Sequence, residues 1–142
     1  MKKLVSAAGA VLLLVSSPLF AHHSFAMFDL TQKVLIEGKI SDIQWTNPHV
    51  WIHVDVANKD GSVVTWPLEL TSIVHLTRRG FPKNQLAVGD SGTFMLSPYA
   101  NGKPGGRFYA IELDKGVLYL EPGAQRDWER LEGGGAQSAA AQ

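Results

Sequence analysis

The segment PHVWIHVDVA, residues 48–57, decides the fold because apolar and polar side chains alternate strictly along it. One face carries four branched aliphatic side chains, Val50, Ile52, Val54 and Val56. The other face carries His49, Trp51, His53 and Asp55. Alternation with a period of two residues is typical of a β-strand that buries one face. We therefore predict a half-buried strand whose second face gathers two histidines, a tryptophan and a carboxylate.

The next segment predicts the partner of this strand. Residues 58–61 (NKDG) have the composition of a turn, and residues 63–70 (VVTWPLEL) alternate again. Matching the apolar faces across the turn pairs residues whose numbers sum to about 120. This register places Trp51 opposite Glu69 and His53 opposite Pro67. Because proline cannot donate a ladder hydrogen bond, we expect the second strand to lie at an edge or to bulge there.

The remaining segments complete a small barrel. Residues 33–45 predict a first strand, with a bulge or bend at Gly38. Thr71 can cap a short helix over residues 72–79, and Gly80 ends it. Further strands are predicted over residues 92–97, 107–113 and 118–120. We therefore expect an all-β fold with small helical content, a five-stranded OB-like Greek-key barrel with one short helix between strands 3 and 4.

Composition limits the classes of function. The chain has 142 residues, 13 basic and 13 acidic side chains and no cysteine. That length suits one domain with a core. Without cysteine there are no disulfides, thiolate metal sites or cysteine nucleophiles, so a metal site must use histidine and carboxylate. The neutral balance gives no electrostatic basis for nucleic-acid binding.

The N-terminus has the layout of a secretory signal peptide. Lys2 and Lys3 precede an apolar run over residues 7–15, which is too short to span a membrane. Cleavage after Ala21 would remove two lysines and no acid, leaving 11 basic and 13 acidic side chains and a net charge of −2. We expect a periplasmic or secreted protein with no membrane span after processing. Its parts would be the signal peptide at 1–21, the barrel domain at 22–121 and a flexible tail at 122–142.

Processing would also create a metal-binding group. A free N-terminal His22 offers its amine and its imidazole to one ion, and His23 follows directly. Nitrogen ligands of this kind suit Cu(II), Zn(II) or Ni(II), and copper has the highest intrinsic affinity. His49 and His53 lie about 13 Å apart on a regular strand, too far for a simple pair. We therefore predict a site of His22, His23 and one of His49 or His53, with Glu69 as an oxygen ligand or as a hydrogen-bond acceptor behind a ligand.

Two other functions remain open. The face that carries Trp51, His53 and Asp55 could bind a periplasmic protein, a peptide or a small ligand without metal, because strands 2 and 3 form the ligand-binding face of OB-folds. A weaker alternative is a copper oxidoreductase centred on His22. The sequence contains no nucleophile elbow, P-loop or dinucleotide fingerprint, so we expect a non-enzymatic protein. The preferred hypothesis is an exported β-barrel protein that binds a metal ion and does not bind nucleic acid.

Three motifs together resemble an uncharacterised family of small exported bacterial proteins. They are AHHSF at residues 21–25, WTNPHVW at residues 45–51 and LTRRG at residues 76–80. The likeness runs from about Ala21 to Leu120. The resemblance implies export and a small β-barrel, and it implies no reaction.

Overall fold

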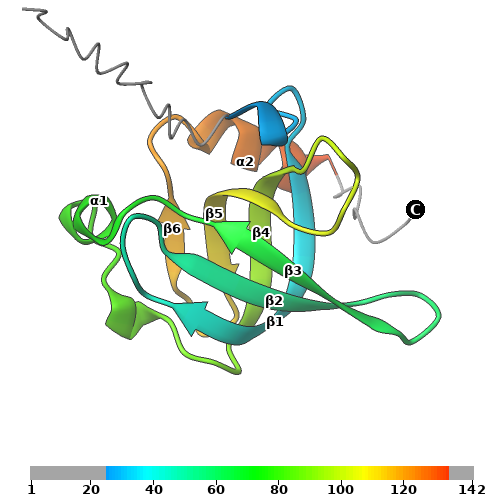
Figure 1. Cartoon of the computed structure of the whole chain (residues 1–142), viewed down its shortest axis with the longest axis horizontal. Coiled ribbons are helices and arrows are strands. Elements are labelled where there is room, and N and C mark those ends of the chain that lie inside the picture. Colours follow the sequence, from blue (N-terminus) through cyan, green and yellow to red (C-terminus); the bar gives the residue numbers. More distant parts are fainter. Residues whose placement is uncertain (1–24, 135–142) are drawn as a thin grey trace, which may run out of the picture.

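The computed structural model describes residues 25–134 and shows a β-barrel with helices at its margins (Figure 1). The strands are β1 (Val34–Gln44), β2 (Trp51–Ala57), β3 (Val63–Glu69), β4 (Ser91–Pro98), β5 (Gly106–Leu113) and β6 (Leu118–Leu120). The helices are α1 (Ile73–Arg78) and α2 (Gln125–Gly133), with 3-10 turns η1 (Phe25–Met27) and η2 (Lys83–Gln85).

The first five strands close into a barrel. Their order is β3-β2-β1-β4-β5, followed by β6, and β3 also pairs with β5. That closing contact is parallel and short, joining Leu68 to Gly106 and Glu69 to Arg107. All the other pairings are antiparallel. With α1 between β3 and β4, this is the strand order of an OB-fold, so the predicted fold class is confirmed.

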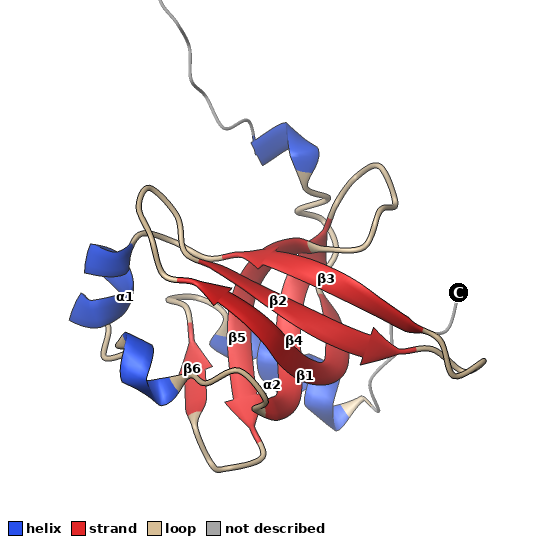
Figure 2. Cartoon of the chain, turned by 60° about the horizontal axis from the view of Figure 1, so that its bottom comes forward, coloured by secondary structure: helices blue, strands red, loops and turns tan. Residues whose placement is uncertain are grey.

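The β2–β3 hairpin has the predicted register. Trp51 lies opposite Glu69 and His53 opposite Pro67. The Leu70 N–H donates to the Val50 carbonyl at 2.9 Å, which extends the same register past the end of β3. The tip of this hairpin projects beyond the barrel (Figure 2). The position of the turn and the alternation of side chains were sufficient to predict this register, because both are local properties of the chain.

Strand β1 is bent, but its irregularity is not at Gly38. It pairs with β4 over residues 34–39 and with β2 over residues 39–44, and the register against β2 shifts between Ile40 and Asp42. Gly38 instead allows a close approach of backbones, since a Cβ there would lie 2.6 Å from the Asp55 carbonyl oxygen. The predicted bulge therefore occurs not at Gly38 but at Ser41. Ser41 is the one extra residue on β1 between the two residues that pair with His53 and Val54 of β2.

Helix α1 forms where predicted, with a different capping residue. The Ser72 hydroxyl accepts from the His75 N–H at 3.4 Å, so Ser72 and not Thr71 is the N-cap. Gly80 follows the helix with φ of +79°, a conformation that suits glycine. Leu76 and Phe81 are completely buried and attach the helix to the end of the barrel.

Inward-facing side chains of every barrel strand fill the interior. Ile36, Ile40, Ile52, Val54, Leu68, Phe94, Leu96, Phe108 and Ile111 are essentially inaccessible to solvent. Burying side chains of this size stabilises the fold by about 1.5–3 kcal/mol each relative to exposure. The four aliphatic residues that define the apolar face of residues 48–57 all belong to this core.

A second cluster lies outside the barrel and was not predicted. Helix α2 places Trp128 against Leu35, Met95 and Ala110 on the outer surface of β1, β4 and β5. Trp128 is only 3% exposed. The expectation of a tail without structure from residue 122 is therefore wrong for residues 125–133, and the remaining domain limits stay a prediction. Within residues 25–134, no helix has the length and apolar character needed to cross a membrane.

Candidate functional site

His49 and Glu69 meet at one end of the barrel. His49 stands just before β2, and Glu69 is the last residue of β3. Because Trp51 pairs with Glu69, the side chain of His49 can lie diagonally across from the carboxylate. The His49 Nδ1 atom contacts Glu69 Oε1. The Glu69 side chain is only 9% exposed and that of His49 is 33% exposed, so the imidazole shields the carboxylate from solvent.

This contact gives the histidine a defined chemical role. An imidazole that donates its Nδ1 proton to a carboxylate carries the lone pair on Nε2. In metalloproteins the same arrangement fixes the tautomer of a ligating histidine and raises its basicity. Glu69 is therefore better placed to orient His49 than to bind a metal ion itself.

His53 has a different carboxylate partner. Its Nδ1 lies 3.4 Å from Asp42 Oδ2, from the neighbouring strand β1. Among the described residues, this buried Nδ1 has no partner with hydrogen-bond geometry. From the sequence, Glu69 was the carboxylate predicted beside the strand histidines, and Asp42 was not identified. The sequence did contain a signal for Asp42. A hairpin centred on Asn47–Pro48 pairs residues whose numbers sum to about 95, which places Asp42 opposite His53.

Trp51 and Asp55, the residues predicted to bind a ligand, lie on the outer face of β2. Trp51 is half-buried between Gln44 of β1 and Glu69 of β3. Asp55 accepts hydrogen bonds from Thr65 Oγ1 at 2.7 Å and from Ser41 Oγ at 3.0 Å. These bonds, chiefly the one from Thr65, hold the pKa of Asp55 below its usual value. Asp55 thus links the three strands of the meander.

The predicted metal ligands are only partly brought together. His49 and Glu69 form one pair and His53 forms another with Asp42. In the part of the chain that the structure describes, no group of three or more histidine and acidic side chains could hold a metal ion. His22 and His23 lie outside the described residues.

The N-terminal segment is attached to the same end of the barrel. Phe28 forms an antiparallel bridge with Tyr99, and the two rings stack at 5.4 Å. The Asp29 N–H donates to the Pro98 carbonyl at 2.8 Å, and the Ala100 N–H donates to the Met27 carbonyl at 2.9 Å. The chain therefore enters the described fold beside the loop between β4 and β5.

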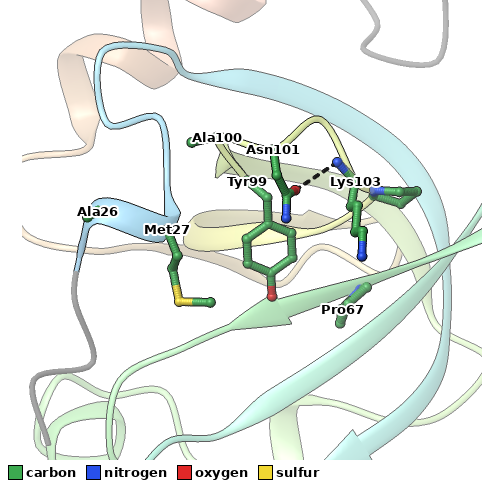
Figure 3. A pocket seen from close by; sticks show the side chains of 8 residues that line it. Ala26, Met27, Pro67, Tyr99, Ala100, Asn101 and Lys103 are labelled. Carbon is green, nitrogen blue, oxygen red and sulfur yellow. Dashed lines mark hydrogen bonds between the residues drawn. The ribbon is translucent and has the colours of Figure 1, made fainter.

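Tyr99 is the residue on which the N-terminal segment packs. Burial, and secondarily the negative charge of Glu69, raise the pKa of Tyr99 above its ordinary value. A pocket of about 450 Å³ opens next to the Tyr99 ring, between η1, Pro67 of β3 and the β4–β5 loop (Figure 3). We call it the Tyr99 pocket; Met27, Asn101, Lys103 and Pro104 also line it.

A buried charge cluster elsewhere was missed by sequence reasoning. Glu121 is 8% exposed, with Arg79 at 3.8 Å and Arg107 at 3.9 Å from its carboxylate oxygens. Burial raises the pKa of Glu121, and the charges of Arg107, Arg79 and His75 oppose that effect. Nothing in the sequence distinguishes this glutamate from a surface residue, since its arginine partners come from the C-cap of α1 and from β5.

Residues 10–108 match the family described as a family of unknown function, DUF6152. The chain belongs to this family. The DUF6152 match includes His22, His23, His49 and Glu69, and it ends inside β5, before β6 and α2. The expected likeness to an uncharacterised family is thereby confirmed, and membership assigns no reaction or ligand.

Other comparisons add little to the family assignment. No curated protein matches the chain. Among solved structures, the chain is similar to the mitochondrial single-stranded DNA binding protein Rim1 of S. cerevisiae. The match has 11% sequence identity and a TM-score of 0.46, and it covers 61% of this chain and 96% of Rim1. This likeness is too distant to carry an argument about function.

Proposed function

We propose that the protein is an exported, non-enzymatic barrel that binds a transition-metal ion, with Cu(II) preferred, through His22 and His49. Signal-peptide cleavage after Ala21 would release it into the periplasm or the medium, with His22 as its first residue. His23 would supply a further nitrogen, and Glu69 would orient His49.

The His49–Glu69 pair beside the attached N-terminal segment carries this proposal. Phe28 is fixed at Tyr99, whose phenol lies within the electrostatic influence of Glu69. Ala26 and Met27 line the same pocket as Tyr99 and Pro67. From residue 25 to residue 22 an extended chain spans at most about 10 Å. A site that combines His22 with His49 would therefore lie within about 10 Å of residue 25.

The donor set suits copper. The amine and imidazole of His22 would bind one ion through two nitrogens, and His49 would add Nε2. Nitrogen-rich sites of this kind follow the Irving–Williams order, in which Cu(II) exceeds Ni(II) and Zn(II). When bound, the ion would be held in a nitrogen-rich site at the end of a rigid barrel.

His49 is a better candidate than His53 for the strand ligand. The acceptor of His49 is a buried carboxylate on β3, the strand that borders the Tyr99 pocket through Pro67. The carboxylate nearest to His53 is that of Asp42, which is 57% exposed and lies on β1, on the opposite side of β2. Ala26 and Met27 of the N-terminal segment line the Tyr99 pocket together with Pro67 of β3, which favours His49 over His53 as the partner of His22.

The test is isothermal titration of Cu(II) into protein that begins at His22 and into the same protein with one additional N-terminal alanine. We expect the addition to weaken binding strongly, because it moves the free amine away from the His22 imidazole. Equal affinities would refute a site that uses the His22 amine. His49→Gln should also weaken binding, whereas His75→Gln on α1 should not.

Export is tested separately. Expression of the full chain in a bacterial host, followed by N-terminal sequencing of the periplasmic product, should give His22 as the first residue. A product that retains residues 1–21, or that stays in the cytoplasm, would contradict both export and the free amine on which the metal site depends.

A further inference from the structure

We infer that the Tyr99 pocket binds a small organic carboxylate with an apolar, preferably aromatic, body. This site is distinct from the metal site and needs no metal ion. Its volume of about 450 Å³ lies within the range typical of small-molecule sites, roughly 300–1,000 Å³.

The walls of the pocket are apolar and come from three separate segments. Met27 belongs to η1, Pro67 to β3, and Tyr99 and Pro104 to the chain between β4 and β5. Figure 3 shows the Tyr99 ring standing between Met27 and the Lys103 side chain. Flat rings and a thioether offer favourable contacts to an aromatic or aliphatic body.

The shape of the pocket is fixed by two packing contacts of Tyr99. Its ring stacks on Phe28. The loop also turns against Tyr99 at Gly105, where φ is +118° and a Cβ would lie 2.6 Å from the Tyr99 ring and 2.7 Å from the Pro67 carbonyl oxygen. Glycine therefore allows the loop to pack directly against Tyr99. A wall held in this way loses little conformational entropy when a ligand binds.

The polar side chains that line the pocket all offer hydrogen-bond donors. Lys103 contributes an ammonium group. The Asn101 Oδ1 atom already accepts from the Lys103 backbone N–H at 3.0 Å, so its amide nitrogen is directed elsewhere (Figure 3). Tyr99 contributes a hydroxyl group, which can also donate.

This donor set selects an anionic head group. None of the described residues that line the pocket is acidic, and Lys103 is the one charged residue among them. A carboxylate can accept from the Lys103 ammonium and from the Asn101 amide, whereas a cationic ligand would be repelled by Lys103. The single lysine and the apolar walls favour a monocarboxylate over a polyanion.

The probe for this site is 3-phenylpropanoate, with the neutral 3-phenylpropanamide as its matched control. Each is titrated into metal-free protein, and backbone amide chemical shifts are followed by NMR. We expect saturable shifts at Pro67-flanking residues and at residues 99–103 for the carboxylate, with a dissociation constant in the millimolar range or tighter. The amide should bind at least several-fold more weakly.

Three variants, one of them a control, test the residues that line the pocket. Lys103→Gln should weaken binding of the carboxylate roughly tenfold or more, because it removes a charge-assisted hydrogen bond. Lys59→Gln, in the exposed turn between β2 and β3, should leave binding unchanged. Tyr99→Phe keeps the ring and should weaken binding less than Lys103→Gln does.

The inference is overturned if the carboxylate causes no saturable shifts, if the amide binds equally well, or if Lys103→Gln binds like the unmodified protein. Because the protein is free of metal throughout, these results do not depend on whether copper binds at His22. Failure of this site and failure of the proposed metal site are therefore distinguishable.

Discussion

His49 and Glu69, twenty residues apart in the chain, meet across the β2–β3 hairpin through the imidazole Nδ1 and a carboxylate oxygen. The pair depends on the hairpin register, which sets Trp51 opposite Glu69. It orients one strand histidine at the end of the barrel where the N-terminal segment is attached.

The first prediction concerns Glu69. If this carboxylate orients His49 for metal binding, Glu69→Gln should weaken Cu(II) binding by about 10–100-fold, the usual loss when such an acceptor is removed. Isothermal titration of the protein that begins at His22 measures this. Asp55→Asn is the matched control, because Asp55 bonds to Thr65 and Ser41 on the same face. Equal losses in both variants would contradict a specific role for Glu69.

The second prediction concerns pH and Glu121. Burial raises the pKa of this carboxyl above its ordinary value of 4.5, so the folded protein keeps the proton to higher pH than the unfolded chain does. Ionisation of Glu121 therefore reduces stability as the pH rises from the unfolded to the folded pKa, and the loss persists above it. Relative to the unmodified protein, Glu121→Gln should gain stability as the pH rises from about 4 to about 7.

Urea unfolding at a series of pH values tests this sign. The variant also loses the negative charge that Arg79 and Arg107 face, and this loss complicates a comparison of absolute stability. The pH dependence of the difference avoids that complication. A difference that does not change with pH, or that favours the unmodified protein more at pH 7 than at pH 4, would show that Glu121 has no raised pKa.

The third prediction concerns the closure of the barrel. Gly106 pairs with Leu68 of β3 and with Pro98 of β4, and a Cβ at this position would overlap the Ser97 carbonyl oxygen. Gly106→Ala should destabilise the protein by about 1–3 kcal/mol or more through overpacking. Gly133→Ala is the control, since a Cβ there would meet nothing within 4 Å. Chemical denaturation should show a clear loss for the first variant and almost none for the second.

The fourth prediction concerns helix α2. Trp128 is buried against Leu35, Met95 and Ala110, so Trp128→Ala should destabilise the protein by about 3–5 kcal/mol. Truncation after residue 121 should cause a similar loss, because it removes the same contacts. If the truncated protein unfolds at the same urea concentration as the full chain, α2 does not contribute to the stability of the barrel.

Sequence reasoning succeeded for elements defined by neighbouring residues. The alternation through Ile52 and Val54, the turn before β3 and the glycine after α1 are local signals, and each element formed where predicted. It failed for α2, because the segment QRDWERLEG has only Trp128 and Leu131 as large apolar side chains. Such a short, polar segment gains its stability from docking on the barrel and not from its own propensity.

The sequence by itself determined the barrel strands, the hairpin register and the face that His49 and His53 share, because side-chain alternation and turn position are properties of adjacent residues. Only the tertiary structure decided where the N-terminal segment attaches and why Glu121 is buried. Those relations arise when distant strands close into a barrel, and closure brings together residues such as Phe28 and Tyr99 that share no local pattern.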